Sequence, residues 1–207
     1  MSIRILGVTG PTGSGKSLLC QELSRMGVPV IDADQVYHSL LFPPSDCLTS
    51  LRHAFGDGIF KEDGSLDRVA LSEKVFSQED QLRLLNATVL HFVLERIRGE
   101  ILRLSREGKN AVAVDGPTLI ESGFHKECDL VLSIISPPPL RLKRIMERDG
   151  ISEERARARI LAQPTEDFYR SHSHWILYND GDWSAVRQGL KEVLRQLNEG
   201  TKEKAKP

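Results

Sequence analysis

Several features that mark special classes of protein are scarce in this sequence of 207 residues. The three cysteines, Cys20, Cys47 and Cys128, are odd in number and lack metal-ligand or redox spacing, which argues against a disulfide framework. The formal net charge is −1, so no overall field favours nucleic acid or a membrane surface. No run reaches the ~20 apolar residues of a transmembrane helix, and no signal-peptide pattern opens the chain. These absences predict a cytoplasmic protein that binds neither nucleic acid nor membrane.

The composition otherwise suits an ordinary globular protein. Hydrophobic residues make up 40% of the chain, enough for a proper core, and the length predicts one domain with an insertion. There is no internal repeat and no low-complexity tract. The polar tail, residues 200–207, is expected to fray.

The most informative segment is residues 10–17, which read GPTGSGKS and fit the phosphate-loop pattern G-x-x-x-x-G-K-[ST]. A β-prone apolar run, residues 3–9, precedes it, and apolar residues at helical spacing follow it. Glycines let backbone N–H groups converge on one anion, and the helix N-terminus adds partial positive charge. We expect Lys16 to reach the β- and γ-phosphates and the Ser17 hydroxyl to help hold Mg²⁺. The alternative, a glycine-rich turn that binds nothing, fits the full match poorly.

Two carboxylates, Asp32 and Asp34, follow a predicted second strand at residues 28–31. Ligand groups collect at the carboxyl ends of parallel strands. If the strand continues, the two side chains point the same way, so that one can face the transferred phosphoryl group while the other orients it or the metal. Alternatively, Asp34 caps a helix that starts near Gln35, a role that is compatible with a catalytic base.

Residues 37–106 differ in character from the rest. Short helical patterns are broken at Pro43–Pro44 and by turns, and a long amphipathic helix is predicted over residues 78–106. A helical block between the second and third strands indicates an inserted acceptor-binding region, with plain scaffold as the alternative. His91 lies near the apolar stripe of the long helix, where a lone histidine more often packs than binds.

The third predicted strand, residues 111–114, ends at Asp115. An apolar strand that ends in aspartate is typical of the second carboxylate site of phosphate-loop enzymes, which bonds the Mg²⁺ shell through water or Ser17. Glu121 lies on a predicted short helix, residues 119–124, and either contacts substrate or is solvated.

After a buried fourth strand, residues 129–136, two arginine-rich helices are predicted over residues 140–149 and 152–163. We expect them to form a lid that closes over a triphosphate, with at least one arginine neutralising its charge. The alternative is a solvated charged face. A fifth strand, residues 174–178, and a closing helix complete the pattern. His172 and His174, on the approach to that strand, lack a third ligand and are not expected to bind metal.

Five strands with crossover helices and a phosphate loop after the first predict an α/β P-loop kinase fold, a five-stranded parallel sheet flanked by helices. In order, the motifs also resemble the dephospho-CoA kinase family over residues 7–181. The matching pieces are TGPTGSGKS at 9–17, IDAD at 31–34, FG at 55–56, DGSLDR at 63–68, VF at 75–76, His91, four residues of the family's D-x-P-L-L-x-E pattern (Asp115, Pro117, Leu119 and Glu121), LKR at 142–144, RD at 148–149, Gln163 and NDG at 179–181.

This resemblance implies ATP-dependent phosphorylation of the ribose 3′-hydroxyl of dephospho-CoA, the last step of coenzyme A synthesis, with Mg²⁺. By position it implies Asp34 as the base, Arg144 as the lid arginine on the ATP phosphates, and His91 in the acceptor pocket. Asn179 and Gly181 are implied in the adenine-side loop. The predicted catalytic residues are therefore Asp34, Lys16 and Arg144, and the predicted metal ligands are Ser17 and Asp115. The residues expected to bind ATP are Thr12, Gly13, Ser14, Gly15, Lys16, Ser17, Arg144, Asn179 and Gly181. Those expected to bind the acceptor are Asp32, Asp34, His91 and Glu121.

Predicted boundaries within the single domain are a core of residues 1–36, 107–139 and 172–199, an acceptor-binding region at 37–106, a lid at 140–171 and a tail at 200–207. We expect a monomer or weak homo-oligomer.

The sequence departs from the family pattern at Pro11 and Thr12, Pro44–Ser45, and Phe92, Thr118, Tyr169 and His174. These departures bear on substrate affinity and lid contacts more than on the reaction class. A kinase of another small acceptor, a nucleoside, nucleotide or shikimate-like acid, is the main alternative; a non-enzymatic nucleotide-binding module ranks last because Lys16, Asp34 and the lid arginines are all present.

Overall fold

The structure is a computed structural model in which residues 3–76 and 78–200 are described. The chain divides into two compact units, one with the residues up to Ile31 and from Arg103 onwards, the other Asp32–Leu102. The acceptor-binding region predicted at residues 37–106 begins five residues after the second unit begins and ends four residues after it ends. Most of the predicted tail, residues 201–207, lies outside the described residues.

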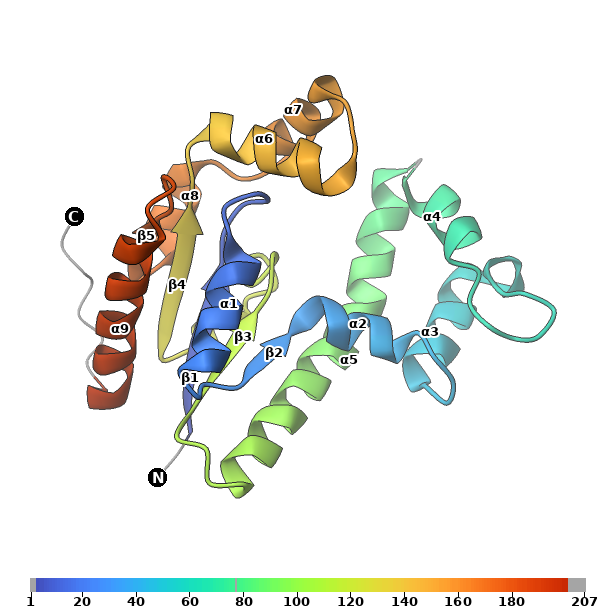
Figure 1. Ribbon diagram of the computed structural model, residues 1–207. Helices are drawn as coiled ribbons and strands as arrows, with labels where there is room; N and C mark the ends of the chain where they lie inside the picture. The colour runs from blue at the N-terminus through green and yellow to red at the C-terminus, as the bar shows by residue number, and fades with distance from the viewer. Residues whose placement is uncertain (1–2, 77, 201–207) are drawn as a thin grey trace. The chain divides into compact units, whose positions relative to one another are not determined.

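The first unit is built on a parallel sheet whose strands lie in the order β2-β3-β1-β4-β5 (Figure 1). The strands are β1 (Arg4–Thr9), β2 (Val30–Asp32), β3 (Ala111–Asp115), β4 (Leu130–Ile135) and β5 (Trp175–Tyr178). β1 pairs in parallel with both β3 and β4, and β4 pairs in parallel with β5. The central position of β1 places the loop that follows it at the middle of the carboxyl edge, where open α/β sheets bind ligands.

Helices cover both faces of this sheet. α1 (Lys16–Arg25) and α9 (Trp183–Glu199) pack on one face, and α8 (Glu166–His172) packs on the other. The same unit contains the short 3₁₀ helix η2 (Phe124–Glu127), and α6 (Pro138–Asp149) and α7 (Glu153–Leu161), which lie beyond the carboxyl end of β4 (Figure 1). Pro137 is the N-cap of α6 and Pro138 is its first residue, a place that suits proline because the first turn of a helix has no intrahelical acceptor for an N–H group.

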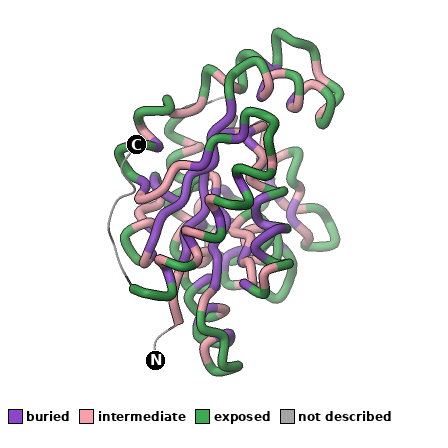
Figure 2. Tube along the Cα trace, turned by 60° about the vertical axis from the view of Figure 1, so that its left-hand side comes forward, coloured by how far each residue is buried: buried purple, intermediate pink, exposed green. Residues whose placement is uncertain are grey.

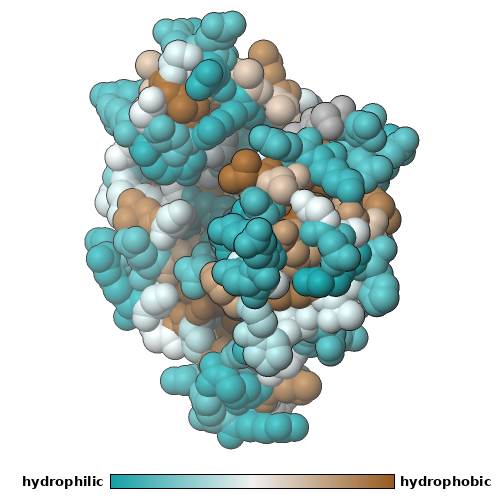
Figure 3. Space-filling model, turned by 90° about the vertical axis from the view of Figure 1, so that its right-hand side faces the viewer, coloured by the Kyte–Doolittle hydropathy of each residue, from teal (hydrophilic) through white to brown (hydrophobic). Residues whose placement is uncertain are grey.

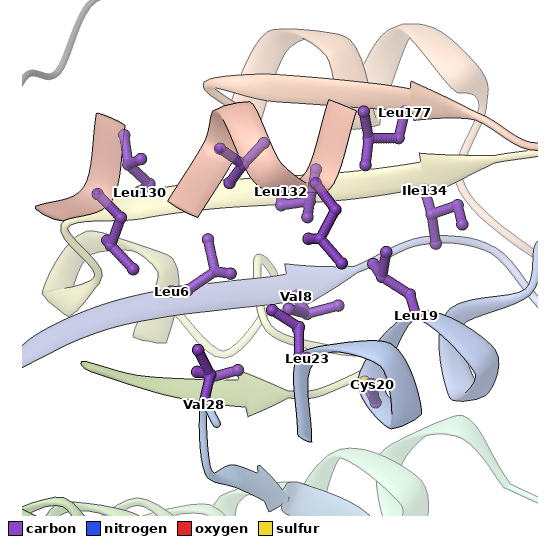
Figure 4. Close-up of a cluster of buried hydrophobic side chains, with 14 of the residues drawn as sticks. Leu6, Val8, Leu19, Cys20, Leu23, Val28, Leu130, Leu132, Ile134 and Leu177 are labelled. Carbon is purple, nitrogen blue, oxygen red and sulfur yellow. The ribbon is translucent and has the colours of Figure 1, made fainter. Parts of the chain in front are cut away.

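Every residue of β4 is buried, because its side chains alternate between two faces of the sheet and both faces are covered. Leu130, Leu132 and Ile134 face a core that they share with β1, α1 and α9 (Figure 4). On the other face, Ile135 packs with Tyr169 of α8, and the Ser133 hydroxyl bonds that of Ser173. Figure 2 shows the same burial along the central strands. A strand covered on both faces reads as a continuous apolar run, as this one does.

The second unit is helical, as predicted. It contains α2 (Ala33–Leu40), α3 (Asp46–Phe55), the 3₁₀ helix η1 (Asp57–Ile59), α4 (Arg68–Phe76) and most of α5 (Glu79–Arg106). Its own core includes Leu51, Phe55, Ile59 and Val89. On the face that Figure 3 shows, hydrophobic residues form small patches separated by hydrophilic ones. Within residues 3–76 and 78–200, no helix is both long and apolar enough to cross a membrane.

Three local expectations were wrong. Residues 117–122 form turns and not the predicted helix at 119–124, since Gly123 takes a left-handed conformation (φ 80°) and η2 begins only after it. Asp32, not Asp34, caps α2, because β2 runs on to Asp32 and Ala33 already begins the helix. His172 ends α8 and does not lie on an extended approach to β5.

Candidate phosphate-binding site

The loop between β1 and α1 presents unpaired backbone donors. Gly15, the N-cap of α1, has φ 104° and no side chain caps the helix. Among the described residues, the N–H groups of Gly13, Gly15, Lys16 and Ser17 have no acceptor. Unpaired N–H groups at a helix N-terminus form an anion site, because their dipoles and the helix dipole favour negative charge.

Close packing around the loop requires glycine at two of its positions. A Cβ on Gly10, where φ is 144°, would lie 2.3 Å from the carbonyl oxygen of Ile134 in β4. A Cβ on Gly15 would lie 2.4 Å from Nδ2 of Asn179, which follows β5. The sheet therefore supports the loop closely from the side of β4 and β5, and only glycine fits both the space and the positive φ.

Donors outside the loop hold its carbonyl groups. Arg141 Nε donates to the carbonyl of Thr12 at 2.9 Å, and Arg144 Nη1 to that of Gly13 at 3.1 Å. Asn179 Nδ2 donates to the carbonyl of Ser14 at 2.7 Å. In a trans peptide, C=O and N–H point in opposite directions. Holding the Thr12 and Ser14 carbonyls outward therefore directs the N–H groups of Gly13 and Gly15 the other way.

Lys16 and Asp115 form an ion pair. Asp115, the last residue of β3, is paired with Val8 across the sheet, which brings it next to the start of the loop. Its side chain is 10% exposed and that of Lys16 19%. Asp115 is thus the counter-ion of the phosphate-loop lysine, a role that the sequence analysis did not foresee. The Ser17 residue is exposed at the start of α1.

The residues present fit a nucleotide with a divalent cation. Ser14 Oγ is buried and has no partner within the described part of the chain, so a polar group of a ligand can satisfy it. No group of three or more His, Cys, Asp or Glu among these residues could hold a metal by itself. Mg²⁺ characteristically binds through one or two protein groups together with substrate phosphates, a pattern that Ser17 and Asp115 can meet.

The arginines of the expected lid fall into two groups. Arg148 and Arg159 both pair with Asp149, and Arg157 pairs with Glu153, as in a solvated charged surface. The Arg148 guanidinium holds the pKa of Asp149 below its usual range. Arg141 and Arg144 donate to carbonyls of the loop instead, and Arg148 Nη2 also lies 3.5 Å from Thr12 Oγ1. The solvated face, posed as the alternative to the lid, therefore describes Arg157 and Arg159, whereas a lid arginine on the phosphates remains a prediction.

Arg144 and Asn179 were expected on the nucleotide, and their side chains support the loop. Besides the Gly13 carbonyl, Arg144 donates to Ser136 Oγ at 2.8 Å and to Asn179 Oδ1 at 3.3 Å. Asn179 is buried, and Gly181 lies in the exposed turn beyond it with φ 120°. Direct contacts of Arg144, Asn179 and Gly181 with ATP remain predictions. Ser136 is a site residue that the sequence analysis missed, since a serine that ends a buried strand gives no local signal.

Thr12 departs from its predicted role. Its N–H donates to Gln163 Oε1 at 2.9 Å, so this amide is directed away from the anion site. The sequence analysis noted Gln163 only as a family motif, and it did not single out Arg141 within the predicted arginine-rich helix at residues 140–149. Neither was expected to contact the loop.

Glu121 lies in the turns after β3, exposed to solvent. Burial and, secondly, the Glu121 carboxylate raise the pKa of the Tyr169 hydroxyl to about 12, while Arg141 opposes them. Tyr169 stands where the family pattern has a basic residue, and it is 2% exposed. A packed tyrosine therefore feels the opposing charges of a carboxylate and of an arginine that supports the loop.

Three predicted site residues belong to the second unit. Asp32 Oδ1 accepts from the N–H groups of Asp34 and Gln35 at 2.9 and 3.1 Å, as a helix cap does. Asp34 is exposed in the first turn of α2. His91 is exposed on α5 with its ring 3.8 Å from that of Phe92, so it is not part of the buried core. Their roles remain predictions.

Comparison with known proteins gives consistent matches. A family model described as dephospho-CoA kinase matches residues 4–185. A dephospho-CoA kinase of Geobacillus kaustophilus is 36% identical over 92% of this chain and 95% of its own. One of Arabidopsis thaliana is 34% identical over 94% of this chain and 84% of its own. The solved structure of a dephospho-CoA kinase from Campylobacter jejuni has a TM-score of 0.68 at 26% identity, covering 95% of this chain and 98% of that one.

Proposed function

This chain belongs to the dephospho-CoA kinase family, whose activity is the ATP-dependent phosphorylation of dephospho-CoA at the end of coenzyme A biosynthesis, and we propose how its residues carry out that reaction. The observation that carries the proposal is the set of unpaired N–H groups at Gly13, Gly15, Lys16 and Ser17, beside the Lys16 ammonium. Such a set suits the β- and γ-phosphates of ATP.

Lys16 exchanges part of its interaction with Asp115 for the phosphate oxygens of ATP. Ser17 and Asp115 would hold Mg²⁺, which when bound would neutralise charge on the phosphates. Because the loop N–H groups are already oriented, they stabilise developing charge without reorganising during the reaction.

Asp34 accepts the proton of the ribose 3′-hydroxyl of dephospho-CoA. The 3′-oxygen forms a bond to the γ-phosphorus while the bond from that phosphorus to the β,γ-bridging oxygen breaks, giving coenzyme A and ADP. Asp32 holds Asp34 in place through the cap of α2, and both are exposed to solvent or only half-buried, as groups that must meet a substrate are. His91 and Glu121 contact the acceptor. We further propose that the chain acts in the cytoplasm as a monomer or weak homo-oligomer.

The test is ADP release from Mg-ATP with and without dephospho-CoA, with the product identified by mass. Acceptor-dependent ADP release and a product heavier by one phosphoryl group are expected. A matched Lys16→Met variant should lose this activity by at least 10²-fold, the order found on removing one transition-state charge contact. If ADP release ignores dephospho-CoA but responds to a nucleoside, nucleotide or shikimate-like acid, the acceptor assignment is wrong and the kinase assignment stands.

A further inference from the structure

Residues from the segment that carries α6 and α7 contact every polar group of Thr12, including its hydroxyl, which accepts from Arg148 Nη2 at 3.5 Å. Its N–H donates to Gln163 Oε1 at 2.9 Å, and its carbonyl accepts from Arg141 Nε at 2.9 Å. Arg141 Nη2 also donates to the same Gln163 oxygen, at 2.8 Å. One arginine and one glutamine thus close a ring of hydrogen bonds around a single residue of the phosphate loop, over 129 and 151 residues of sequence.

Arg141 has an unusual environment for a cation. It is 8% exposed, and no carboxylate of residues 3–76 or 78–200 pairs with it. Burial lowers the pKa of its guanidinium. A buried charge without a counter-ion is costly, and here only the Thr12 carbonyl and the Gln163 amide oxygen compensate it. Arg141 therefore does not stabilise the fold as a member of an ion pair. Instead, its positive charge lies next to a site for an anion.

The ring of bonds determines which amides the loop presents. Gln163 turns the Thr12 N–H away from the anion site. Arg141, by holding the Thr12 carbonyl outward, points the N–H of Gly13 in the opposite direction, since both belong to one trans peptide. The unpaired donors are consequently those of Gly13, Gly15, Lys16 and Ser17.

We propose that Arg141 and Gln163 are positioning residues for the phosphate loop. They hold the loop in its anion-binding conformation before the triphosphate arrives and tie the segment of α6 and α7 to it. Preformed donors avoid the free-energy cost of ordering the loop during binding. The inference rests on the proposed function only in taking ATP as the ligand of the loop.

Gln163→Leu is the decisive variant, because it removes the shared acceptor and leaves the buried arginine in place. The loss of one such hydrogen bond predicts a rise of about 5-fold to 10-fold in the KM and Kd for Mg-ATP, with a smaller change in kcat. Amide hydrogen exchange of residues 10–17 in the intact chain should become faster. Gln163→Glu keeps an acceptor for Thr12 and for Arg141, and it should stay within about 3-fold of the wild type.

Gln196→Leu is the matched control. Gln196 Oε1 accepts from the Trp175 indole at 2.9 Å, so the variant removes a glutamine acceptor of the same kind in the same unit. It should leave ATP affinity and loop exchange as in the wild type. Unchanged ATP affinity and loop exchange in Gln163→Leu would overturn the proposal, as would equal losses in Gln163→Leu and Gln163→Glu. Failure of the wild type to phosphorylate dephospho-CoA would refute the proposed function instead, while the exchange measurement would still test the positioning role.

Discussion

The ammonium group of Lys16, at the start of α1, donates a hydrogen bond to the carboxylate of Asp115 at the end of β3. The pairing of Val8 with Asp115 between β1 and β3 brings these residues together, although 99 positions separate them in sequence. In this position the Asp115 carboxylate can orient Lys16 toward the phosphates and can help to hold the metal ion. The two roles can be separated by mutation.

Asp115→Asn should lower kcat by about 10²-fold and raise the Mg²⁺ concentration needed for half-maximal rate, because the change removes one negative charge from a nearly buried site. Steady-state kinetics over a magnesium titration measures both. Asp129→Asn is the control: Asp129 pairs with Arg4 at 3.0 Å before β4, so it loses a comparable ion pair with no expected magnesium effect. An Asp115→Asn enzyme with normal magnesium dependence would leave Asp115 only the role of holding Lys16.

Asp34→Asn should reduce phosphoryl transfer by about 10²-fold to 10⁴-fold, the usual contribution of a general base, while Mg-ATP still binds. Single-turnover kinetics and calorimetric binding test the two statements separately. Asp32→Asn retains a good N-cap for α2, so it should fold normally and lose less activity. Wild-type turnover by Asp34→Asn would end its assignment as the base.

Gly10→Ala should destabilise the protein by more than Gly27→Ala. Both positions have positive φ, 144° and 83°, and alanine in that region costs about 1–2 kcal/mol. Only at Gly10 would the new methyl group also meet a backbone atom, 2.3 Å away, whereas nothing lies within 4 Å at Gly27. Urea unfolding of the two variants measures the difference. Equal losses would mean that β4 can move away from the loop.

Glu22→Gln should lose stability in a pH-dependent way. Hydrogen bonds from Arg187, 2.8 Å from Glu22 Oε1, keep the pKa of this carboxyl below its usual range. A lowered folded-state pKa stabilises the fold fully above the unfolded-state pKa, and the gain disappears as pH falls through the folded-state value. The difference in unfolding midpoint between wild type and Glu22→Gln should therefore be largest near neutral pH and shrink in acid.

Glu192→Gln is the control for that measurement. Glu192 is exposed and bonded to Arg195 three residues along α9, so solvent screens the pair and removing it should change stability little at any pH. A constant gap between wild type and Glu22→Gln across the acid range would contradict the assigned pKa shift.

The sequence predicted the strands, the phosphate loop and the long helix of the second unit well, because each has a local signal. Residues 10–17 carry a complete motif, and the predicted helix at 78–106 is observed as Glu79–Arg106. The predictions were wrong at places where a single residue determines where a helix begins. A single left-handed glycine, Gly123, separates turns from η2, and one further residue in β2 moved the cap of α2 from Asp34 to Asp32.

The sequence by itself determined that the chain presents a phosphate-binding loop at the start of a helix, since glycine spacing, the lysine and the helix N-terminus all act within eight residues. Tertiary structure alone decided which arginines reach the phosphate loop. Arg141, Arg144 and Arg148 recur on one helix and look alike locally, yet the first two donate to carbonyls of the loop, while the third pairs with Asp149 and reaches only the Thr12 hydroxyl, at 3.5 Å. The reason is physical: the hydrogen bonds from Arg141 and Arg144 join residues 129 and 131 positions apart, so only the packing of α6 against the loop selects which guanidinium reaches which carbonyl.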